Sequence, residues 1–173
     1  MASRLKVDAS SLKEFEKQLK QLQEEDMQQF NEQTVKELAT RLLEKVIDRT
    51  KPGQYPPSSG KQGGTLRRGW TAKTEQEAMD GTGDGRNILE YVNLLNVNRE
   101  NGSYIIEINN PVHYASYVEY GHRKRGPKGD IGGDGWVPGK FMLTISEQQL
   151  EAEGPAIIER RLKAFLKEAL DGK

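Results

Sequence analysis

Apolar residues recur every three or four positions through the first 50 residues, which is the spacing of one face of a helix. Ser11 and Glu14 form a capping box, in which each side chain satisfies an unpaired amide at a helix start. A run of three acids then interrupts the apolar stripe. The pattern predicts helices over residues 10–23 and 26–50, and the second has an apolar face that a sheet or a partner should cover. A coiled coil is the alternative, but the repeat is too short and irregular for heptads.

Glycine and proline divide the middle of the chain into short elements. Residues 51–64 are rich in Pro, Gly and Ser, and they predict a loop that is long for a compact domain. We expect one helical turn at residues 65–70, which leads into a strand at 70–73. A second glycine-rich connection follows at residues 80–86.

The clearest β pattern is a hairpin. Apolar and polar residues alternate over residues 103–109, and Asn101-Gly102 suits the positive φ angles of a tight turn. The first arm, near residues 91–98, is so rich in apolar residues that a helix is also compatible with it. A strand is the favoured interpretation.

The last third of the chain returns to helices. We expect a helical turn at residues 111–120 ended by Gly121, a basic glycine-rich loop at 123–135, a short strand or extended segment at 136–143, and a helix at 145–171 broken at Gly154-Pro155. The elements together predict an α+β fold. A small antiparallel sheet packs against a long N-terminal helix and a C-terminal helix, and long glycine- and proline-rich loops join them.

Composition adds that the core is thin. The chain has 173 residues, enough for one domain, but only 34% are hydrophobic and 30% are charged. We therefore treat residues 1–173 as one domain, with residues 1–25 as a helical extension and residues 51–64 and 123–135 as flexible loops. Such a chain either buries further apolar surface against neighbouring subunits or is a small domain with flexible ends.

Charge and cysteine content exclude several classes of protein. Basic and acidic residues number 26 each, so no overall charge attracts nucleic acid. The chain has no cysteine, which excludes disulfide scaffolds, zinc–thiolate sites and cysteine nucleophiles. No apolar run reaches the ~20 residues of a membrane span, and the N-terminus lacks a signal-peptide core. We expect a soluble protein made in a cytoplasm, without membrane association.

No motif predicts catalysis, a metal or a cofactor. His113 and His122 are the only histidines, and Glu119 between them does not complete a ligand set, so ordinary surface histidines are expected. Residues 81–85 (GTGDG) lack the Gly-Lys-Ser/Thr ending of a phosphate loop. No serine lies in a nucleophile elbow. An acid pair in a small hydrolase stays open as an enzyme alternative, but we expect a protein that is not an enzyme.

Two basic clusters remain as candidate contact sites. One is Arg67 and Arg68 beside Trp70, and the other comprises Arg123, Lys124, Arg125 and Lys128. Solvated loop charge explains each cluster by itself. The functional interpretation is that a cluster contacts DNA or an acidic neighbouring protein. A nucleic-acid-binding module is therefore the alternative function for this chain.

Two motifs carry a resemblance to a known family. Residues 65–70 (TLRRGW), then a hairpin, then residues 114–121 (YASYVEYG) and a C-terminal helix resemble a minor tail-component family of long-tailed bacteriophages. The resemblance covers about residues 30–170, and the second motif is the more specific. The family usually has Ala-x-Pro-Phe-Leu before the last helix, whereas this chain has residues 136–143 (WVPGKFML) with the proline displaced.

The resemblance implies a structural role in a virion. Members of the family act as tail-completion or neck proteins that form rings at the head–tail junction or tail end of phages, defective prophages or tail-like bacteriocins. It implies a homo-oligomer, namely a hexameric ring, which contacts neighbouring tail and head-connector proteins and DNA in its lumen.

Heterologous, head-to-tail contacts would close such a ring. We expect Tyr114, Tyr117 and Val118 to pack the helical turn onto the hairpin, while Glu119 and Tyr120 face a neighbouring subunit. The candidate subunit-interface residues are Leu66, Arg67, Arg68, Trp70, Tyr117, Glu119, Tyr120, Arg123, Lys124, Arg125, Trp136 and Phe141.

Overall fold

The computed structural model describes residues 24–60, 63–81, 87–124 and 135–170. The predicted helix at residues 10–23, the core of the glycine-rich connection at 80–86 and most of the loop at 123–135, with Arg125 and Lys128, lie outside the described residues. The described part has the predicted α+β class, with two long helices and small antiparallel pairs of strands.

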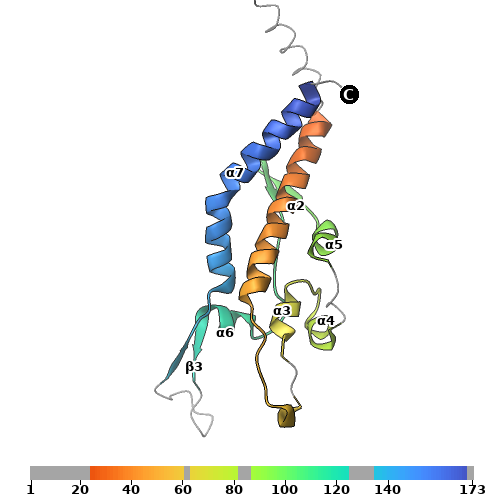
Figure 1. Ribbon diagram of the computed structural model, residues 1–173. Coiled ribbons are helices and arrows are strands. Elements are labelled where there is room, and N and C mark those ends of the chain that lie inside the picture. Colours follow the sequence, from red (N-terminus) through yellow and green to blue (C-terminus); the bar gives the residue numbers. More distant parts are fainter. Residues whose placement is uncertain (1–23, 61–62, 82–86, 125–134, 171–173) are drawn as a thin grey trace, which may run out of the picture.

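Two long helices form the frame of the molecule. Helix α2 (Glu24–Arg49) and helix α7 (Met142–Leu170) lie side by side, and the short elements lie along them and at one end of the pair (Figure 1). The predicted break at Gly154-Pro155 is wrong, because α7 continues through Pro155. Proline removes one backbone hydrogen bond and bends a helix, and packing against α2 on both sides of the bend retains the helix. Figure 1 shows α7 bending toward α2 part-way along its length.

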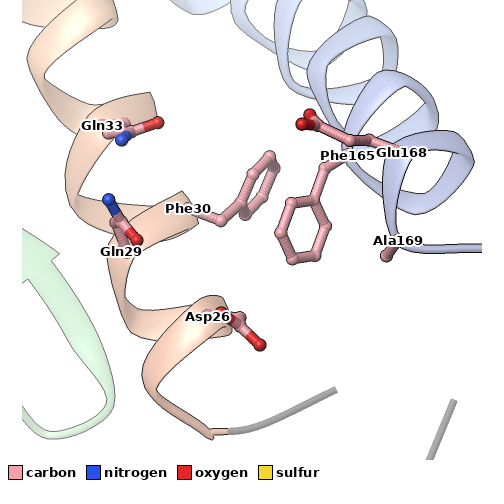
Figure 2. Close-up of a pocket in the computed structure, with 7 residues that line it drawn as sticks. All are labelled: Asp26, Gln29, Phe30, Gln33, Phe165, Glu168 and Ala169. Carbon is pink, nitrogen blue, oxygen red and sulfur yellow. The ribbon is translucent and has the colours of Figure 1, made fainter. Parts of the chain in front are cut away.

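Aromatic and charged contacts hold the two helices together. Near the N-terminal end of α2, the rings of Phe30 and Phe165 pack 4.8 Å apart at an open pocket whose lining is mostly polar (Figure 2). Two turns further on, Glu37 pairs with Arg41 and also with Arg161 of α7. Burial by itself would raise the pKa of the Glu37 carboxyl, but hydrogen bonds and charge from the two arginines outweigh it and lower that pKa.

Three short helices follow the loop after α2: α3 (Thr65–Gly69), α4 (Glu75–Asp80) and α5 (Ile88–Asn93). Helix α5 packs against α2, and α4 packs against α3. A 3-10 turn, η1 (Pro57–Ser59), lies in the loop itself. The strands predicted at residues 70–73 and 91–98 are therefore wrong. Residues 70–73 form a turn after α3 instead, in which Thr71 N donates to Arg68 O at 3.1 Å and Ala72 N donates to Gly69 O at 3.4 Å. The Thr74 hydroxyl then caps α4 by accepting from Glu77 N at 3.2 Å. The Asn87 side chain accepts from Leu89 N at 3.2 Å and starts a helix where the apolar pattern alone suited a strand.

The predicted hairpin exists, but its strands are shorter. Strand β1 (Asn98–Glu100) pairs antiparallel with β2 (Ser103–Ile105) around Asn101 and Gly102, which have φ of 50° and 80° as a tight turn requires. After β2, residues 106–109 continue with alternate exposure but without a strand assignment. Their backbone groups make no backbone hydrogen bond to any described residue. The chain thus presents an open strand edge beside the helices.

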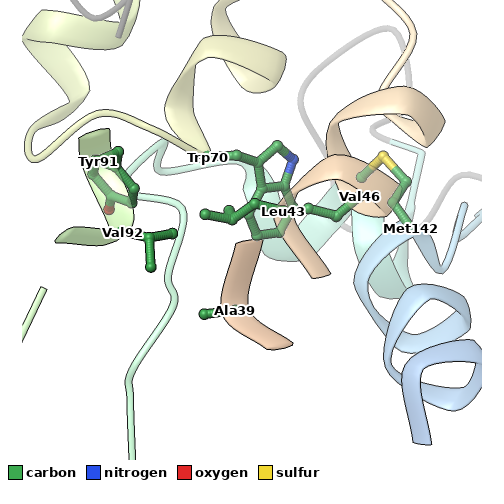
Figure 3. Close-up of a cluster of buried hydrophobic side chains, with 7 residues drawn as sticks. All are labelled: Ala39, Leu43, Val46, Trp70, Tyr91, Val92 and Met142. Carbon is green, nitrogen blue, oxygen red and sulfur yellow. The ribbon is translucent and has the colours of Figure 1, made fainter. Parts of the chain in front are cut away.

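The core lies where α2, α5, the end of α3 and the start of α7 meet (Figure 3). Its buried members are Ala39, Leu43, Val46, Trp70, Tyr91, Val92 and Met142. The Trp70 indole Nε1 donates to the Thr50 hydroxyl at 2.9 Å, and that hydroxyl donates to Val46 O at 2.7 Å. This chain of hydrogen bonds satisfies the buried polar atoms and fixes α3 against the C-terminal end of α2.

Candidate interaction surface

A tight helix–hairpin unit occupies the end of the molecule where α2 ends and α7 begins (Figure 1). Helix α6 (Ala115–Tyr120) runs directly into β3 (Gly121–Arg123), which pairs antiparallel with β4 (Trp136–Pro138). Gly121 has φ of 87°, and a Cβ there would lie 2.5 Å from Val137 O. Only glycine allows this junction. Sequence analysis predicted the turn and its terminal Gly121 but not that residues 121–123 pair with 136–138.

This unit exposes four large aromatic side chains. Tyr117 is 57% exposed, Tyr120 61%, Trp136 57% and Phe141 43%. We call these four residues the aromatic end. Single exposed apolar residues are ordinary, but aromatic side chains gathered in one unit mark a contact surface. Phe141 directly precedes α7, and its backbone N–H donates to Glu119 O at 3.1 Å, which ties it to α6.

The prediction for Tyr117 was wrong in one respect, since its side chain does not pack α6 onto the first hairpin. Val118 instead contacts the main core, and Tyr114 contacts a second small cluster around Ala72, Ala78 and Val112. Burial raises the pKa of the Tyr114 hydroxyl, and the charge of Glu75 adds to the effect. Tyr114 and Val118 therefore anchor α6 while Tyr117 and Tyr120 face outward.

Glu119 does not face a neighbour, because its side chain is 94% buried inside this unit (6% exposed). The carboxylate accepts from Leu143 N at 3.0 Å and from both Thr144 N and the Thr144 hydroxyl at 2.9 Å. These amides belong to the first turn of α7, which has no acidic residue of its own. Glu119 thus caps α7 from a distant element, where a negative charge also meets the positive end of the helix dipole. The expectation of a surface role is corrected to a structural one.

Exposed positive charge lies beside the aromatic end. Arg123 pairs with Trp136 across the β3–β4 ladder, and both Arg123 and Lys124 are exposed, as is Lys140 before Phe141. Among the described residues, none of these three cations has a side-chain hydrogen bond or an ion pair, so their charges face solvent. Arg125 lies outside the described residues.

The other predicted cluster, residues 65–70, does not form a common surface. Trp70 is buried in the core and Leu66 packs against it. Arg68 turns inward and donates to backbone carbonyls at the end of α4, including Ala78 O at 2.8 Å, where the last carbonyls of a helix lack partners. Only Arg67 is exposed. For Trp70 and Arg68 the expectation of a surface contact is therefore wrong, because their side chains stabilise the fold.

The two histidines differ from each other. His113 is exposed and pairs with Glu75, and the hydrogen bond from the imidazole lowers the pKa of that carboxyl. His122 is half-buried against Tyr117, with ring centroids 5.9 Å apart, and its buried Nδ1 has no hydrogen-bond partner among the residues that the structure describes. The surface prediction thus holds for His113 and not for His122. The described part of the chain contains no group of three side chains that could hold a metal ion.

An apolar groove that sequence analysis missed runs between α2, the residues after β2, and α7. It is formed by two adjoining hollows that share Leu38, Glu147 and Leu150. We call it the helix groove; its lining comprises Val35, Leu38, Ala39, Leu42, Tyr104, Ile105, Ile106, Ile108, Leu143, Glu147, Leu150, Glu151, Gly154, Pro155 and Ile158. The spacing of apolar residues identifies an apolar face on α2. It does not show which residues of that face other elements cover and which remain exposed.

A family model described as "Bacteriophage HK97-gp10, putative tail-component" matches residues 13–121. The chain belongs to this HK97-gp10-like family of bacteriophage tail components. The match starts earlier than the resemblance carried by the motifs and ends at Gly121, so β4 and α7 lie beyond it. Comparisons with curated proteins and with solved structures give no match. No helix among the described residues is long and apolar enough to cross a membrane.

Proposed function

We propose that this tail component is a tail-completion or neck subunit, which assembles into a ring at the head–tail junction or tail end of a phage or phage-like particle. The role is structural rather than catalytic. A hexamer is the ring order that the family resemblance implies, and the neighbours in the particle are tail and head-connector proteins.

The observation that carries the proposal is the aromatic end. Tyr and Trp side chains contribute most to binding when a partner covers them fully, and each buries about 150–250 Å². Four such exposed side chains on one unit, in a family of tail components, fit a subunit whose surface is completed by its neighbours. The thin core of the isolated chain agrees with this view, because a ring subunit buries further apolar surface on assembly.

The test is whether the aromatic end is needed for assembly and not for folding. Tyr120→Ala and Trp136→Ala should leave the thermal unfolding of the isolated chain unchanged, since both side chains are mostly exposed. Incorporation into particles, measured by immunoblotting of purified tails, should fall at least about tenfold, the loss that one interface anchor carries.

Leu94→Ala on α5 is the matched control, because Leu94 is 56% exposed but lies away from the aromatic end. It should be incorporated like the original protein. Normal incorporation of both aromatic variants would reject the aromatic end as an assembly surface.

DNA contact is the second candidate function, favoured by the exposed Arg123 and Lys124 beside Trp136. Cations with neighbouring aromatic rings suit the backbone and bases of nucleic acid. A salt-sensitive gel shift with duplex and single-stranded DNA, compared with Arg123→Gln/Lys124→Gln, tests it. Absence of a shift by the assembled protein, or an equal shift by the variant, would exclude this role for the two residues.

A further inference from the structure

The aromatic end and the helix groove are complementary in shape and in charge. The aromatic end projects large apolar side chains and is flanked by the cations Arg123, Lys124 and Lys140. The helix groove is concave and apolar, and two acidic residues of α7, Glu147 and Glu151, line it. The projecting, positively charged surface therefore complements the apolar, negatively charged groove.

Among the residues that the structure describes, the charges on both surfaces have no partner within the chain. Neither Glu147 nor Glu151 makes an ion pair or a side-chain hydrogen bond in the part of the chain that the structure describes, although both are exposed. Elsewhere on the same helix, Glu153 is paired with Lys45 at 2.8 Å. The helix groove thus keeps its negative charge available, as the aromatic end keeps its positive charge.

We infer that the aromatic end of one copy of this chain docks into the helix groove of the next copy, with Arg123 and Lys124 facing Glu147 and Glu151. The inference rests on the proposed ring function and names the partner of the aromatic end. The two surfaces differ, so the contact is heterologous, and repetition of such a contact closes a ring or extends a fibre. Opposite charges then set the register, while burial of the aromatic rings supplies the affinity.

Charge disfavours other occupants of the helix groove. A symmetric pair of grooves would bring Glu147 and Glu151 of one copy against the same acids of its partner, which like charges oppose. A nucleic-acid strand in the groove would bring phosphates against those carboxylates. A basic, aromatic surface is the complementary occupant, and the chain itself carries one.

The absence of cysteine allows a direct test by cross-linking. Pro138→Cys places a thiol beside Trp136 on β4, and Gln148→Cys places one beside Glu147 on α7; both positions are exposed and neither is an anchor. When the two single variants are mixed and treated with a short bis-maleimide, a covalent dimer should form between them. The double variant Pro138→Cys/Gln148→Cys should give a ladder that ends at the ring order.

Matched controls define the outcomes of the cross-linking. A mixture of Pro138→Cys with Lys73→Cys, an exposed position on neither surface, should give no dimer above background. A dimer of Gln148→Cys with itself, or particles that incorporate both variants without the mixed cross-link, would overturn the inference. The first outcome would indicate a symmetric groove pair, and the second a different protein or another segment of the chain in the groove.

Charge reversal provides the second arm. Arg123→Glu/Lys124→Glu and Glu147→Lys/Glu151→Lys should each weaken self-association at least about tenfold, measured by sedimentation. The quadruple variant should recover most of the loss, because the pairing is restored with reversed signs. Two harmful reversals without recovery would reject the docking but retain the ring function. A chain that remains monomeric and never enters particles would reject the ring function itself.

Discussion

Glu119 is a residue whose role changes once its surroundings are known. Its carboxylate holds two amides and one hydroxyl in the first turn of α7, at a point where the chain direction reverses from α6 through the β3–β4 hairpin. The only acid within an aromatic motif thus links two elements that lie about 25 residues apart in sequence. Glu119 therefore stabilises the folded chain, and the folded chain in turn holds the aromatic end in place.

We expect Glu119→Ala to lower the free energy of unfolding by about 2–3 kcal/mol, because three charge-assisted hydrogen bonds are lost and buried amides are left unpaired. Glu119→Gln should lose less, since the amide oxygen still accepts from Thr144. Urea denaturation of the three proteins measures the difference. Equal stability of the alanine variant and the original protein would contradict the capping role.

The same substitution should have very different effects at two glycines. A Cβ at Gly69 would lie 2.2 Å from Asn110 Oδ1, and the Asn110 amide donates to Leu66 O at 2.7 Å. Gly69→Ala should therefore cost at least about 2 kcal/mol. At Gly154, inside α7, the new Cβ would meet no other element within 4 Å, but the Cδ of the adjoining Pro155 disfavours helical backbone at a residue that carries a Cβ. The gain in helix propensity is therefore largely offset, and Gly154→Ala should change the stability by less than about 1 kcal/mol. Thermal unfolding distinguishes the two variants, and an equal loss of stability at both positions would contradict this account.

At the scale of elements, sequence patterns predicted the long helices and some short elements, including the helical turn at residues 65–70, but assigned two short segments to strands wrongly. The helix over residues 26–50, the turn at Asn101-Gly102 and the end of α6 at Gly121 follow from periodicity and turn chemistry, and all are confirmed. Residues 91–98 were assigned to a strand because apolar residues crowd there, whereas the Asn87 cap starts a helix instead. A short apolar run suits either element, so a local cap or a tertiary contact decides between them.

The candidate surface was predictable only in part. Tyr120 and Trp136 are candidate interface residues by sequence and both are exposed, as are Arg123 and Lys124. Burial of Trp70 was not predictable, because its partner Thr50 lies 20 residues earlier and across a long loop. The helix groove depends on how α2, α7 and the residues after β2 sit in three dimensions, which no local pattern contains.

The α2–α7 pair should respond to acid through Glu37. Its pKa is lowered in the folded chain, so its contribution to stability is complete above the ordinary glutamate value of 4.5 and is lost as the pH falls through the lower folded value. We expect Glu37→Gln to be less stable than the original protein by about 1 kcal/mol at pH 7, a figure that allows for solvent screening. The difference should shrink as the pH falls below 4.5, because the folded chain then loses the charge of Glu37.

Glu44→Gln is the control for this experiment, because Glu44 lies on the same helix, is exposed, and makes no ion pair among the described residues. Its stability should follow that of the original protein at every pH. A Glu37→Gln difference that is independent of pH would show that packing, not the charge of Glu37, stabilises the helix pair.

At the scale of the whole molecule, the net charge is zero, but positive and negative side chains gather on different surfaces. Cations flank the aromatic end, while acids line the helix groove on α7. A chain with this arrangement has little overall repulsion between copies and a preferred relative orientation. The different locations of the positive and negative charges are consistent with a protein whose copies assemble in one fixed relative orientation.

Self-association should therefore depend on salt. We expect it to weaken several-fold between about 0.05 M and 0.5 M NaCl, because screening acts on the exposed charges at the contact. Sedimentation velocity at a series of salt concentrations measures the effect, and Leu94→Ala should show the same slope as the original protein. Association that is unchanged or stronger at high salt would assign the contact to apolar burial alone.

The open edge at residues 106–109 has a consequence for how this protein behaves at high concentration. An extended segment with unpaired backbone groups and inward isoleucines is a template on which any other extended chain can add a strand and begin to aggregate. Glu107 stands between Ile106 and Ile108 and is exposed. Its charge opposes in-register stacking of copies, because identical carboxylates would meet. We therefore expect Glu107 to limit aggregation of the isolated chain.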